Sequence, residues 1–435
     1  MKKILIISYY FPPLIDVGSL RALGFAKHLK THGWEPIVLS VKNPDTSLCK
    51  VGKQKAPPGI KTFYCRSWFN LNRATWKING IFKILFKTLN KSLKTNIVQD
   101  LTCIPDAFIG WVIPAYLEGF KIIKDQDIDV VYVSSKPFSS ALTGVMLKKV
   151  TGIPLVLDFR DPASFPASLF NKNLAGQINR KATERIEKFV LSRVNKLITT
   201  TEATKEIYLK MYPFLNGNIH RVYNGYFLPP QKFRRKKKTK KFTIAYAGNF
   251  YHTLIPSETF FKSLKKIIDE KIVNSDHIEF LYIGHLREKN NWFIEAESKY
   301  ELQGLLKATG YLPRDKVQKV TNECALQLLR IVPPMISTKL FEALRDGIPL
   351  LALIEGGEVE RLVKIYSPNS YVITSGKVED VVAAIVDAYN KWKKGHLDCI
   401  RNDEYLKKFC KETLTAEFVN IINDAYKVKS IRNLN

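Results

Sequence analysis

The chain has 435 residues, of which 46% are hydrophobic and 25% are charged. This length exceeds one ordinary core and predicts two domains, while the apolar fraction excludes a disordered chain. The 68 Lys and Arg residues against 40 Asp and Glu residues give a formal net charge of +28, which indicates an anionic partner: nucleic acid, an anionic membrane face or a phosphorylated substrate.

Strand and helix patterns alternate in the first half of the chain. Apolar runs predict buried strands over residues 3–9 and 35–41, and a helix that starts at Ser19 and stops at Gly33 joins them. Such a βαβ unit favours a parallel sheet. Further buried strands are predicted over residues 130–134, 155–159 and 196–200.

A basic, proline-containing stretch, LPPQKFRRKKKTKK, follows Asn224 and Gly225. No core could absorb it, so we place a domain boundary there. A second α/β series follows, with strands predicted over residues 242–247, 278–283, 325–331, 350–354 and 371–374. The predicted architecture is α/β, with doubly wound domains over residues 1–227 and 242–400 and a basic linker over residues 228–241.

Residues 46–99 contain eleven basic residues and no Asp or Glu. Within this basic amphipathic segment, most clearly over residues 61–99, apolar residues line one helical face and lysines the opposite one: Lys83, Lys87, Lys91 and Lys94. This pattern is typical of a helix in a membrane interface, where each lysine near anionic lipid contributes about 1 kcal/mol. A surface helix with solvated lysines is the alternative interpretation.

Gly18, Ser19 and Arg21 follow the first strand and open the first helix. Backbone N–H groups and the helix dipole at such a turn favour a phosphate, and Arg21 adds charge, so we predict a nucleotide-binding loop. A purely structural glycine is the alternative. The GxGxxG and GxxxxGK[ST] patterns are missing, which argues against nicotinamide cofactors and P-loop chemistry.

The motif LVLDFRDPAS places Asp158, Arg160 and Asp161 at the end of a buried strand. Two carboxylates around an arginine can position a sugar hydroxyl or balance a leaving phosphate, so we predict a catalytic role. A turn with an internal ion pair is the alternative. Gly248 and Asn249 follow the first strand of the second domain and are predicted to bind nucleotide in the same way.

Residues 337–360 predict a helix, a sharp stop, a buried strand and a second helix start. Ligands of open α/β sheets bind beyond the carboxyl ends of the strands. Lys339, Glu342 and the turn Gly356-Gly357-Glu358 are therefore predicted to hold a phosphorylated ligand, although the segment also fits one more βα unit. The sequence shows no acidic cluster of metal-site type, so we expect neither a metal nor a cofactor.

The six cysteines are scattered, without a CxxC pair or the Cys/His spacing of a zinc site. We interpret them as free thiols of a cytoplasmic protein. Two adjacent prolines, Pro12 and Pro13, interrupt the first apolar run too early for a signal peptide, and no apolar stretch reaches the roughly 20 residues of a membrane span. The expected protein is soluble or peripheral to the membrane.

The order of several motifs resembles glycosyltransferase family 4, in its bacterial cell-surface polysaccharide branch. The motifs are YYFPPLIDVGSLRALGFAKHLKTHGWEPIVLS, PDAFIGW, VYVSSKPFSSALTG, LDFRDPAS, VYNGY, YAGNF and STKLFEALRDGIPLLALI. The resemblance implies a GT-B fold of two Rossmann-like domains facing across a cleft, with C-terminal helices over residues 401–435 packing back on the first domain. It also implies a nucleotide-sugar donor held mainly by the second domain, and a retaining, metal-independent reaction.

By the same resemblance Glu342 is the ribose carboxylate, Lys339 a phosphate partner and Gly18 part of the donor loop. The chain departs from the family pattern at Pro334, which stands eight residues before Glu342 where a second glutamate is usual. An arginine and lysine pair is also expected after the YAGNF strand, and this chain does not show it plainly.

We therefore expect a glycosyltransferase that moves a sugar from a nucleotide-sugar donor to a lipid-linked or polysaccharide acceptor in cell-envelope glycan biosynthesis, such as lipopolysaccharide or capsule. Its expected place is the inner face of the cytoplasmic membrane, with the anionic membrane surface as a partner. Three alternatives stay open: a hydrolysing nucleotide-sugar epimerase, a non-catalytic partner in a polysaccharide assembly complex, and a basic nucleic-acid-binding protein. Nucleic acid is the least expected partner, because RNP, KH and zinc-finger signatures are missing.

Overall fold

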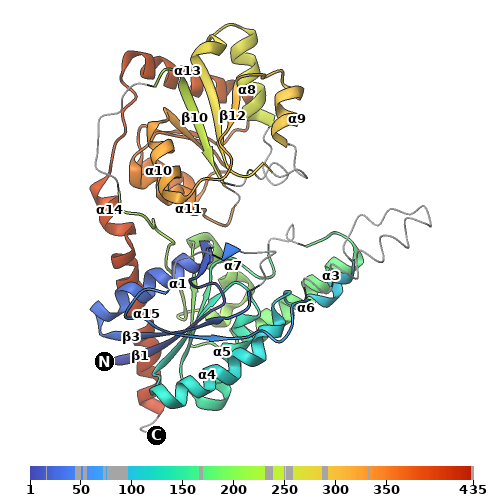
Figure 1. Cartoon of the computed structure of the whole chain (residues 1–435), viewed down its shortest axis with the longest axis vertical. Coiled ribbons are helices and arrows are strands. Elements are labelled where there is room, and N and C mark those ends of the chain that lie inside the picture. Colours follow the sequence, from blue (N-terminus) through green and yellow to red (C-terminus); the bar gives the residue numbers. More distant parts are fainter. Residues whose placement is uncertain are drawn as a thin grey trace, which may run out of the picture. The chain divides into compact units, whose positions relative to one another are not determined.

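The computed structural model describes residues 1–15, 17–44, 50–51, 56–71, 75, 97–165, 170–230, 239–248, 250, 258–286, 292–331 and 333–432. These residues form two compact units, one of Met1–Tyr223 with Lys411–Asn435 and the other of Asn224–Cys410. Each unit is a parallel sheet with helices on both faces (Figure 1). The predicted α/β class with two doubly wound domains is confirmed. The predicted membrane-binding lysines and Asn249 lie outside the described residues.

Among the described residues, seven parallel strands form the main sheet of the first unit. Their order is β5 (Lys61–Cys65), β3 (Trp34–Val41), β1 (Lys2–Ser8), β6 (Val130–Ser135), β7 (Leu155–Phe159), β8 (Lys196–Thr199) and β9 (Ile219–Arg221). A short antiparallel pair, β2 (Leu14–Ile15) and β4 (Lys50–Val51), stands apart from it. Strands β3 and β5 lie on one side of β1, and the later strands β6 to β9 lie on the other side. The strand order therefore reverses beside β1.

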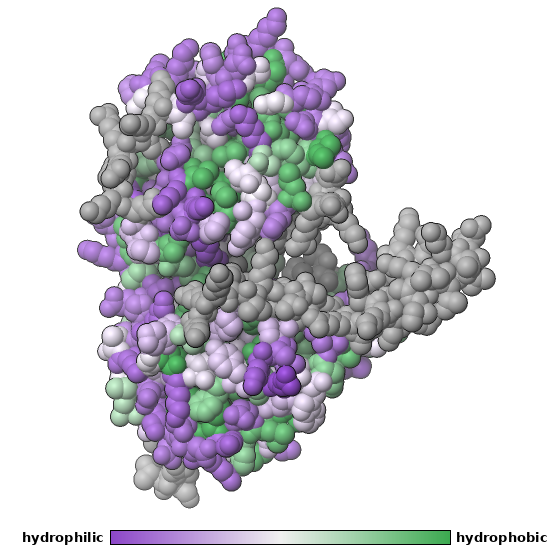
Figure 2. Space-filling model, viewed as in Figure 1, coloured by the Kyte–Doolittle hydropathy of each residue, from purple (hydrophilic) through white to green (hydrophobic). Residues whose placement is uncertain are grey.

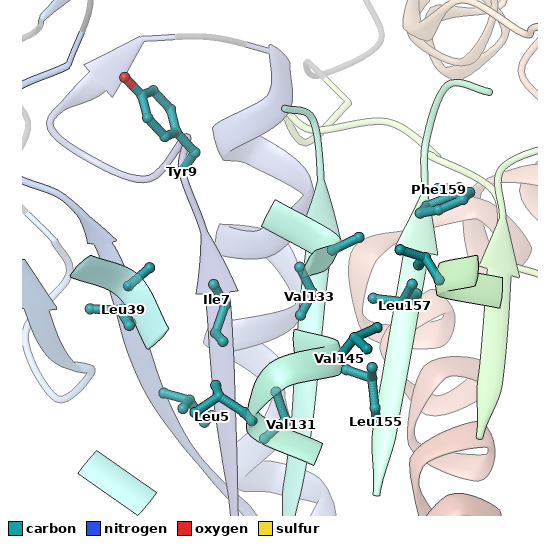
Figure 3. Packing of buried hydrophobic residues seen from close by; sticks show 14 of the residues in the cluster. Leu5, Ile7, Tyr9, Leu39, Val131, Val133, Val145, Leu155, Leu157 and Phe159 are labelled. Atoms are coloured by element: carbon teal, nitrogen blue, oxygen red, sulfur yellow. The ribbon is translucent and has the colours of Figure 1, made fainter. Parts of the chain in front are cut away.

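Two layers of helices cover this sheet, because side chains of a strand point alternately to its two faces. Leu5, Ile7 and their neighbours form an apolar cluster with helices α4 to α7 (Figure 3). The opposite face carries α1 and α15, joined by stacking of Phe25 on Phe418 at 4.5 Å. The helices are α1 (Val17–His28), α3 (Ile97–Thr102), α4 (Val112–Gln126), α5 (Ser140–Thr151), α6 (Leu174–Leu191), α7 (Glu202–Met211) and α15 (Lys411–Arg432), with 3-10 turns η1 (Leu29–His32), η2 (Ile109–Trp111) and η4 (Pro213–Leu215).

Six parallel strands are described in the sheet of the second unit. Their order is β12 (Leu306–Ala308), β11 (Ile278–Ile283), β10 (Phe242–Ala247), β13 (Leu326–Arg330), β14 (Leu350–Leu353) and β15 (Tyr371–Ile373). The helices are α8 (Glu258–Asp269), α9 (Trp292–Lys299), α10 (Arg314–Glu323), α11 (Thr338–Asp346), α12 (Glu358–Tyr366), α13 (Val378–Lys394) and α14 (Asp403–Phe409), with the 3-10 turn η5 (Ser275–His277). Here the strand order reverses beside β10.

The end of the second unit differs from the predicted boundary at residue 401. Helix α14 packs within the second unit, where the Tyr405 hydroxyl donates to the Phe341 carbonyl at 2.9 Å and Phe409 lies against Phe341. Of the C-terminal helices α14 and α15, only α15 belongs to the first unit. Asn423 of α15 accepts hydrogen bonds from the side chains of Lys2 and Trp34. Within the described residues, the helices fall short of the length and apolarity needed to cross a membrane. Hydrophilic residues dominate the visible surface, with apolar residues scattered among them (Figure 2).

Candidate functional site

The carboxyl end of the second unit's sheet gathers the strongest candidate site. Strand β10 lies between β11 and β13, and the chain proceeds outward from it on both sides. In an open α/β sheet this reversal leaves a crevice beyond the strand ends, which is where ligands bind. Tyr246 lies near the end of β10, Gly248 directly follows that strand, and Arg330 is the last residue of the neighbouring β13. Lys339 lies in the first turn of α11, the helix that follows β13.

Lys339 is directed at β10 by the way α11 begins. The Ser337 hydroxyl caps the helix by accepting a hydrogen bond from the Lys339 backbone N–H at 3.3 Å. The Lys339 Nζ then donates to the Tyr246 hydroxyl at 2.9 Å and lies 4.2 Å from the centroid of that ring. This half-buried lysine is thus held against the end of β10.

Gly248 is required beside this lysine for two reasons. Its φ of +94° is a conformation that side-chain-bearing residues rarely adopt, and a Cβ atom added there would lie 2.8 Å from the Lys339 Cε. Close packing continues at Gly284, where an added Cβ would lie 2.9 Å from the Gly248 carbonyl oxygen. The backbone at the ends of β10 and β11 is therefore packed closely against the side chains of Lys339 and Tyr282.

Arg330 brings a second cation to the same place. Its side chain is buried, and the guanidinium carbon lies 4.2 Å from the centroid of the Phe250 ring. Burial lowers the pKa of Arg330 to about 10. Burial, and then the charge of Arg330, lower the pKa of Lys339 to about 7. Two cations whose charges disfavour one another would both be stabilised by a bound anion.

Sequence reasoning missed Arg330 and Tyr246. The family resemblance directs attention to the loop after the YAGNF strand, where an arginine and lysine pair is expected. Among the described residues, the arginine and lysine that come together are Arg330 at the end of β13 and Lys339 at the start of α11. A usable signal existed, since Arg330 is the charged last residue of an otherwise buried strand, LQLLR.

Glu342 lies one turn after Lys339 on the same face of α11. Its carboxylate accepts a hydrogen bond from the Phe227 backbone N–H at 3.0 Å and forms an ion pair with Arg345. Arg345 also pairs with Asp346 and donates to the Leu228 carbonyl at 3.1 Å. Burial raises the pKa of Glu342. Glu342 thus ties Phe227 to α11, and Arg345 ties Leu228 to it. The predicted ribose contact of Glu342 would come in addition to these bonds.

The glycine turn after β14 is less suited to phosphate than predicted. Gly356 and Gly357 have φ of +89° and +78°, and Gly357 is the N-cap of α12. The first turn of α12 already carries two carboxylates, from Glu358 and Glu360. They complement the positive end of the helix and would repel a phosphate, whereas they can accept hydrogen bonds from hydroxyl groups.

The structure corrects the predictions for Asp158 and Arg21. Both side chains are fully buried, and the Arg21 Nε donates to the Asp158 carboxylate at 2.6 Å. The Tyr132 hydroxyl also donates to Asp158, and Arg21 donates to the carbonyls of Val222 and Tyr223, each at 3.0 Å. This buried network links α1 and β7 to the backbone of Val222 and Tyr223. Neither side chain reaches the surface, so Asp158 is not placed to catalyse and Arg21 is not placed to bind phosphate.

Gly18 and Ser19, in the first turn of α1, are buried. Arg160 and Asp161 follow β7 and are partly exposed. Asp161 forms an ion pair of 2.9 Å with Lys136, which follows the neighbouring β6. Of the three residues predicted to be catalytic, these two therefore lie at the carboxyl edge of the first sheet, in the position expected of a site.

A buried glutamate that the sequence did not single out supports the segment after β7. Glu187 of α6 accepts hydrogen bonds from the Ser164 hydroxyl at 2.5 Å and the Tyr208 hydroxyl at 2.7 Å. The Ala163 backbone N–H donates to it at 3.3 Å. From sequence, Glu187 looks like an ordinary surface residue of a charged helix. Its position holds the chain two residues beyond Asp161.

Comparison with known structures places this architecture in a class. The chain is similar to Anabaena Alr3699/HepE in complex with UDP, with a TM-score of 0.63, 12% identity, and coverage of 98% of this chain and 100% of that one. It is also similar to the lipopolysaccharide outer core galactosyltransferase WaaB in its apo form (TM-score 0.55, 13% identity, 97% and 99% coverage). A third similar structure is a protein assigned as a UDP-N-acetylglucosamine 2-epimerase from Listeria monocytogenes (TM-score 0.56, 12% identity, 98% and 97% coverage). The two parallel sheets with their helices have the GT-B fold of these proteins.

The family follows from the sequence match. Residues 20–227 match the model of Glycosyltransferase Family 4, and no curated protein sequence matches the chain. The predicted resemblance to glycosyltransferase family 4 is confirmed by this match, which lies largely in the first half of the chain. Within the residues that the structure describes, no group of three His, Cys, Asp or Glu side chains is arranged to hold a metal ion.

Proposed function

We propose that this glycosyltransferase moves a sugar from a nucleotide-sugar donor to a lipid-linked or polysaccharide acceptor of the cell envelope. The observation that carries the proposal is the cluster of Arg330, Lys339 and Tyr246 at the strand-order reversal of the second sheet. Two adjacent cations suit a diphosphate, which carries charge on both phosphates. The similar protein HepE has been crystallised with UDP, which makes a uridine nucleotide the first donor to test.

The cations of this cluster also suit the chemistry of the transfer. When the bond between the sugar and the donor phosphate breaks, negative charge grows on the departing nucleoside diphosphate. Lys339 and Arg330 are fixed in position before that charge appears, so they can stabilise it without rearrangement. They can thereby fill the role that a metal ion has in other transferases, and we propose a metal-independent reaction with retention at the sugar carbon.

The acceptor hydroxyl must lose its proton as the new glycosidic bond forms. Arg160, Asp161 and Lys136 are the charged groups at the carboxyl edge of the first sheet that can orient such a hydroxyl. The lipopolysaccharide galactosyltransferase among the similar structures supports a cell-envelope glycan as the acceptor class. The proposed place of action is the inner face of the cytoplasmic membrane.

Calorimetry tests the donor site directly. UDP, GDP, ADP and CMP and their common sugars are titrated into the wild-type protein and into Arg330→Gln and Lys339→Gln. Each variant removes a charged hydrogen-bonding partner, so we expect affinity for one nucleotide class to fall about 10-fold to 100-fold. Lys364→Gln is the matched control, because Lys364 is exposed on α12 and pairs with Glu360. A folded wild-type protein that binds none of these ligands would favour the non-catalytic partner instead.

A hydrolysing nucleotide-sugar epimerase is the second candidate. The observation in its favour is the similarity to a structure assigned to that activity. Incubation with donor alone separates the two functions. An epimerase converts the sugar and releases nucleoside diphosphate without any acceptor, whereas the proposed transferase leaves the donor unchanged until an acceptor glycan is added.

A further inference from the structure

The outward face of α6 differs from an ordinary solvated helix surface. Apolar side chains are exposed on it at helical spacing: Leu174 is 73% exposed, Ile178 45% and Phe189 47%. Between them stand three exposed cations, Lys181, Arg185 and Lys188. The exposed residues of α6 include no Asp or Glu, since Glu184 is half-buried beside Arg180 and Glu187 is buried.

Helix α3 extends this face sideways. Its Ile97 and Leu101 are exposed. The helix is fixed to α6 because the Asn179 amide donates to the Asp100 carbonyl at 2.7 Å, and the two helices lie side by side (Figure 1). We call the outward residues of both helices, together with Lys172 just before α6, the α3–α6 surface; they are Ile97, Leu101, Lys172, Leu174, Ile178, Lys181, Arg185, Lys188 and Phe189. Along α6 alone it runs about 22 Å, from Leu174 to Phe189.

A cavity at the start of α6 adds a basic recess to this surface. It encloses about 290 Å³, and Lys172, Arg180 and Lys181 line it together with Phe170. The recess forms because the chain passes very close to the helix at Gly176, where an added Cβ would lie 2.1 Å from the Asn171 carbonyl oxygen. Its size and charge suit the phosphate of a lipid headgroup, and Leu174 and Ile178 stand beside it.

From this arrangement we infer that the α3–α6 surface docks on an anionic lipid bilayer. Exposed apolar residues separated by Lys and Arg along one face of a helix are typical of a helix lying in the membrane interface. There the apolar side chains enter the acyl boundary, while the aliphatic stems of lysine and arginine lie along the apolar layer and their charges meet lipid phosphates. A protein partner would instead be expected to fit a compact apolar patch with its own pockets.

This docking surface deepens the proposed function, because it would place the acceptor side of the enzyme at a lipid-linked glycan. Apart from Ile97, its residues lie outside the basic segment at residues 61–99 that the sequence suggests for membrane binding. The two sites predict different variants to be defective, so the experiment can tell them apart.

The test is sedimentation of the full-length protein with vesicles of phosphatidylcholine, either alone or mixed with phosphatidylglycerol. Lys181→Gln/Arg185→Gln/Lys188→Gln removes the cations, and each cation near anionic lipid is worth about fivefold in partitioning. We expect this variant to bind mixed vesicles at least tenfold more weakly than the wild type. Leu174→Ser/Ile178→Ser should lose the binding that persists at high salt, where charge attraction is screened.

The matched control is Lys316→Gln/Lys319→Gln/Lys394→Gln, which removes the same charge from exposed positions of the second unit. It should sediment like the wild type. Wild-type binding by either α6 variant overturns the inference, and loss of binding only on replacing Lys83, Lys87, Lys91 and Lys94 assigns the membrane site to the other segment. The inference is also overturned if the wild-type protein sediments with neither type of vesicle. Nucleotide affinity is measured in parallel without vesicles, so a failure of the donor-site proposal would be recognised separately.

Discussion

The lowered pKa of Lys339 predicts that donor binding depends on pH around neutrality. Burial and the charge of Arg330 bring this pKa to about 7. An anion binds the protonated form of Lys339. The fraction of protein in that form falls as the pH rises through about 7. One linked proton makes affinity proportional to the protonated fraction, which drops about tenfold between pH 6 and pH 8. The donor itself adds no titration there, because its phosphates are diesters and lack the second ionisation near pH 6.

Three proteins are compared by calorimetry at constant ionic strength. The wild type should bind a nucleotide sugar about tenfold more tightly at pH 6 than at pH 8, and take up close to one proton per ligand at pH 8. Lys339→Arg keeps the positive charge but does not titrate in this range, so its affinity should be flat with pH. Lys339→Gln should be flat as well, at a lower affinity. A flat wild-type profile, or an unchanged pH dependence in Lys339→Arg, would refute the assignment of Lys339 as the titrating anion partner.

The same lysine predicts an opposite trend for the stability of the ligand-free protein. Its folded pKa is lower than its unfolded value of 10.5, so between about pH 7 and pH 10 the unfolded chain binds the extra proton. Its contribution to the free energy of unfolding therefore rises with pH across this window. Comparing wild type with Lys339→Arg in urea melts isolates that contribution, because all other titrating groups are shared.

Three further predictions concern individual positions. Gly248→Ala and Gly395→Ala both force a side chain into positive φ, so each should cost about 1–2 kcal/mol of stability in urea melts. Of these two glycines, only Gly248 contacts Lys339. Loss of nucleotide affinity in both variants would therefore contradict a special role of Gly248. Asp158→Asn leaves Arg21 buried without its counter-charge and should lower the free energy of unfolding by about 3–5 kcal/mol; a fully stable but inactive variant would return Asp158 to catalysis. Asp161→Asn should slow transfer to the acceptor while donor affinity, measured by calorimetry, stays at the wild-type value; a weakened donor affinity would argue against an acceptor-side role.

The central strands could be predicted because they are buried on both faces and therefore appear as continuous apolar runs. Strands β1, β7, β10 and β11 match their predicted positions to within one residue. The short pair β2 and β4 was not predicted. In the two parallel sheets, the described strands that the sequence did not reveal are β5, β9 and β12, which lie at sheet edges. Their sequences, KTFYC, IHR and LKA, are short and partly polar, because an edge strand has a neighbour on one side only. Pattern reasoning thus finds the central strands of both sheets, whereas of the four edge strands it finds only β15 among the described residues.

The candidate site was harder to predict, because a short motif does not show which way each side chain points. In β7, Leu157 and Phe159 belong to the apolar cluster under α4 to α7. Strict alternation then turns Asp158 to the other face, where Arg21 of α1 meets it. Arg160 and Asp161 stand beyond the last paired residue of β7 and are free of this alternation. The motif DFRD thus combines one structural carboxylate with one at the sheet edge, and the parity of the strand separates them.

The donor-side pair shows why local motif matching fails in the second unit. Arg330 and Lys339 are nine positions apart, one on a strand and one on a helix, and a linear search after the YAGNF strand does not join them. They meet because β13 is adjacent to β10 in the sheet and α11 returns its first turn to that same edge. We therefore propose that the donor site lies at the reversal of strand order, with its cations supplied by β13 and α11 rather than by the loop after β10. A chain lacking the expected pair can still hold a diphosphate there, and the pH dependence of Lys339→Arg measures whether it does.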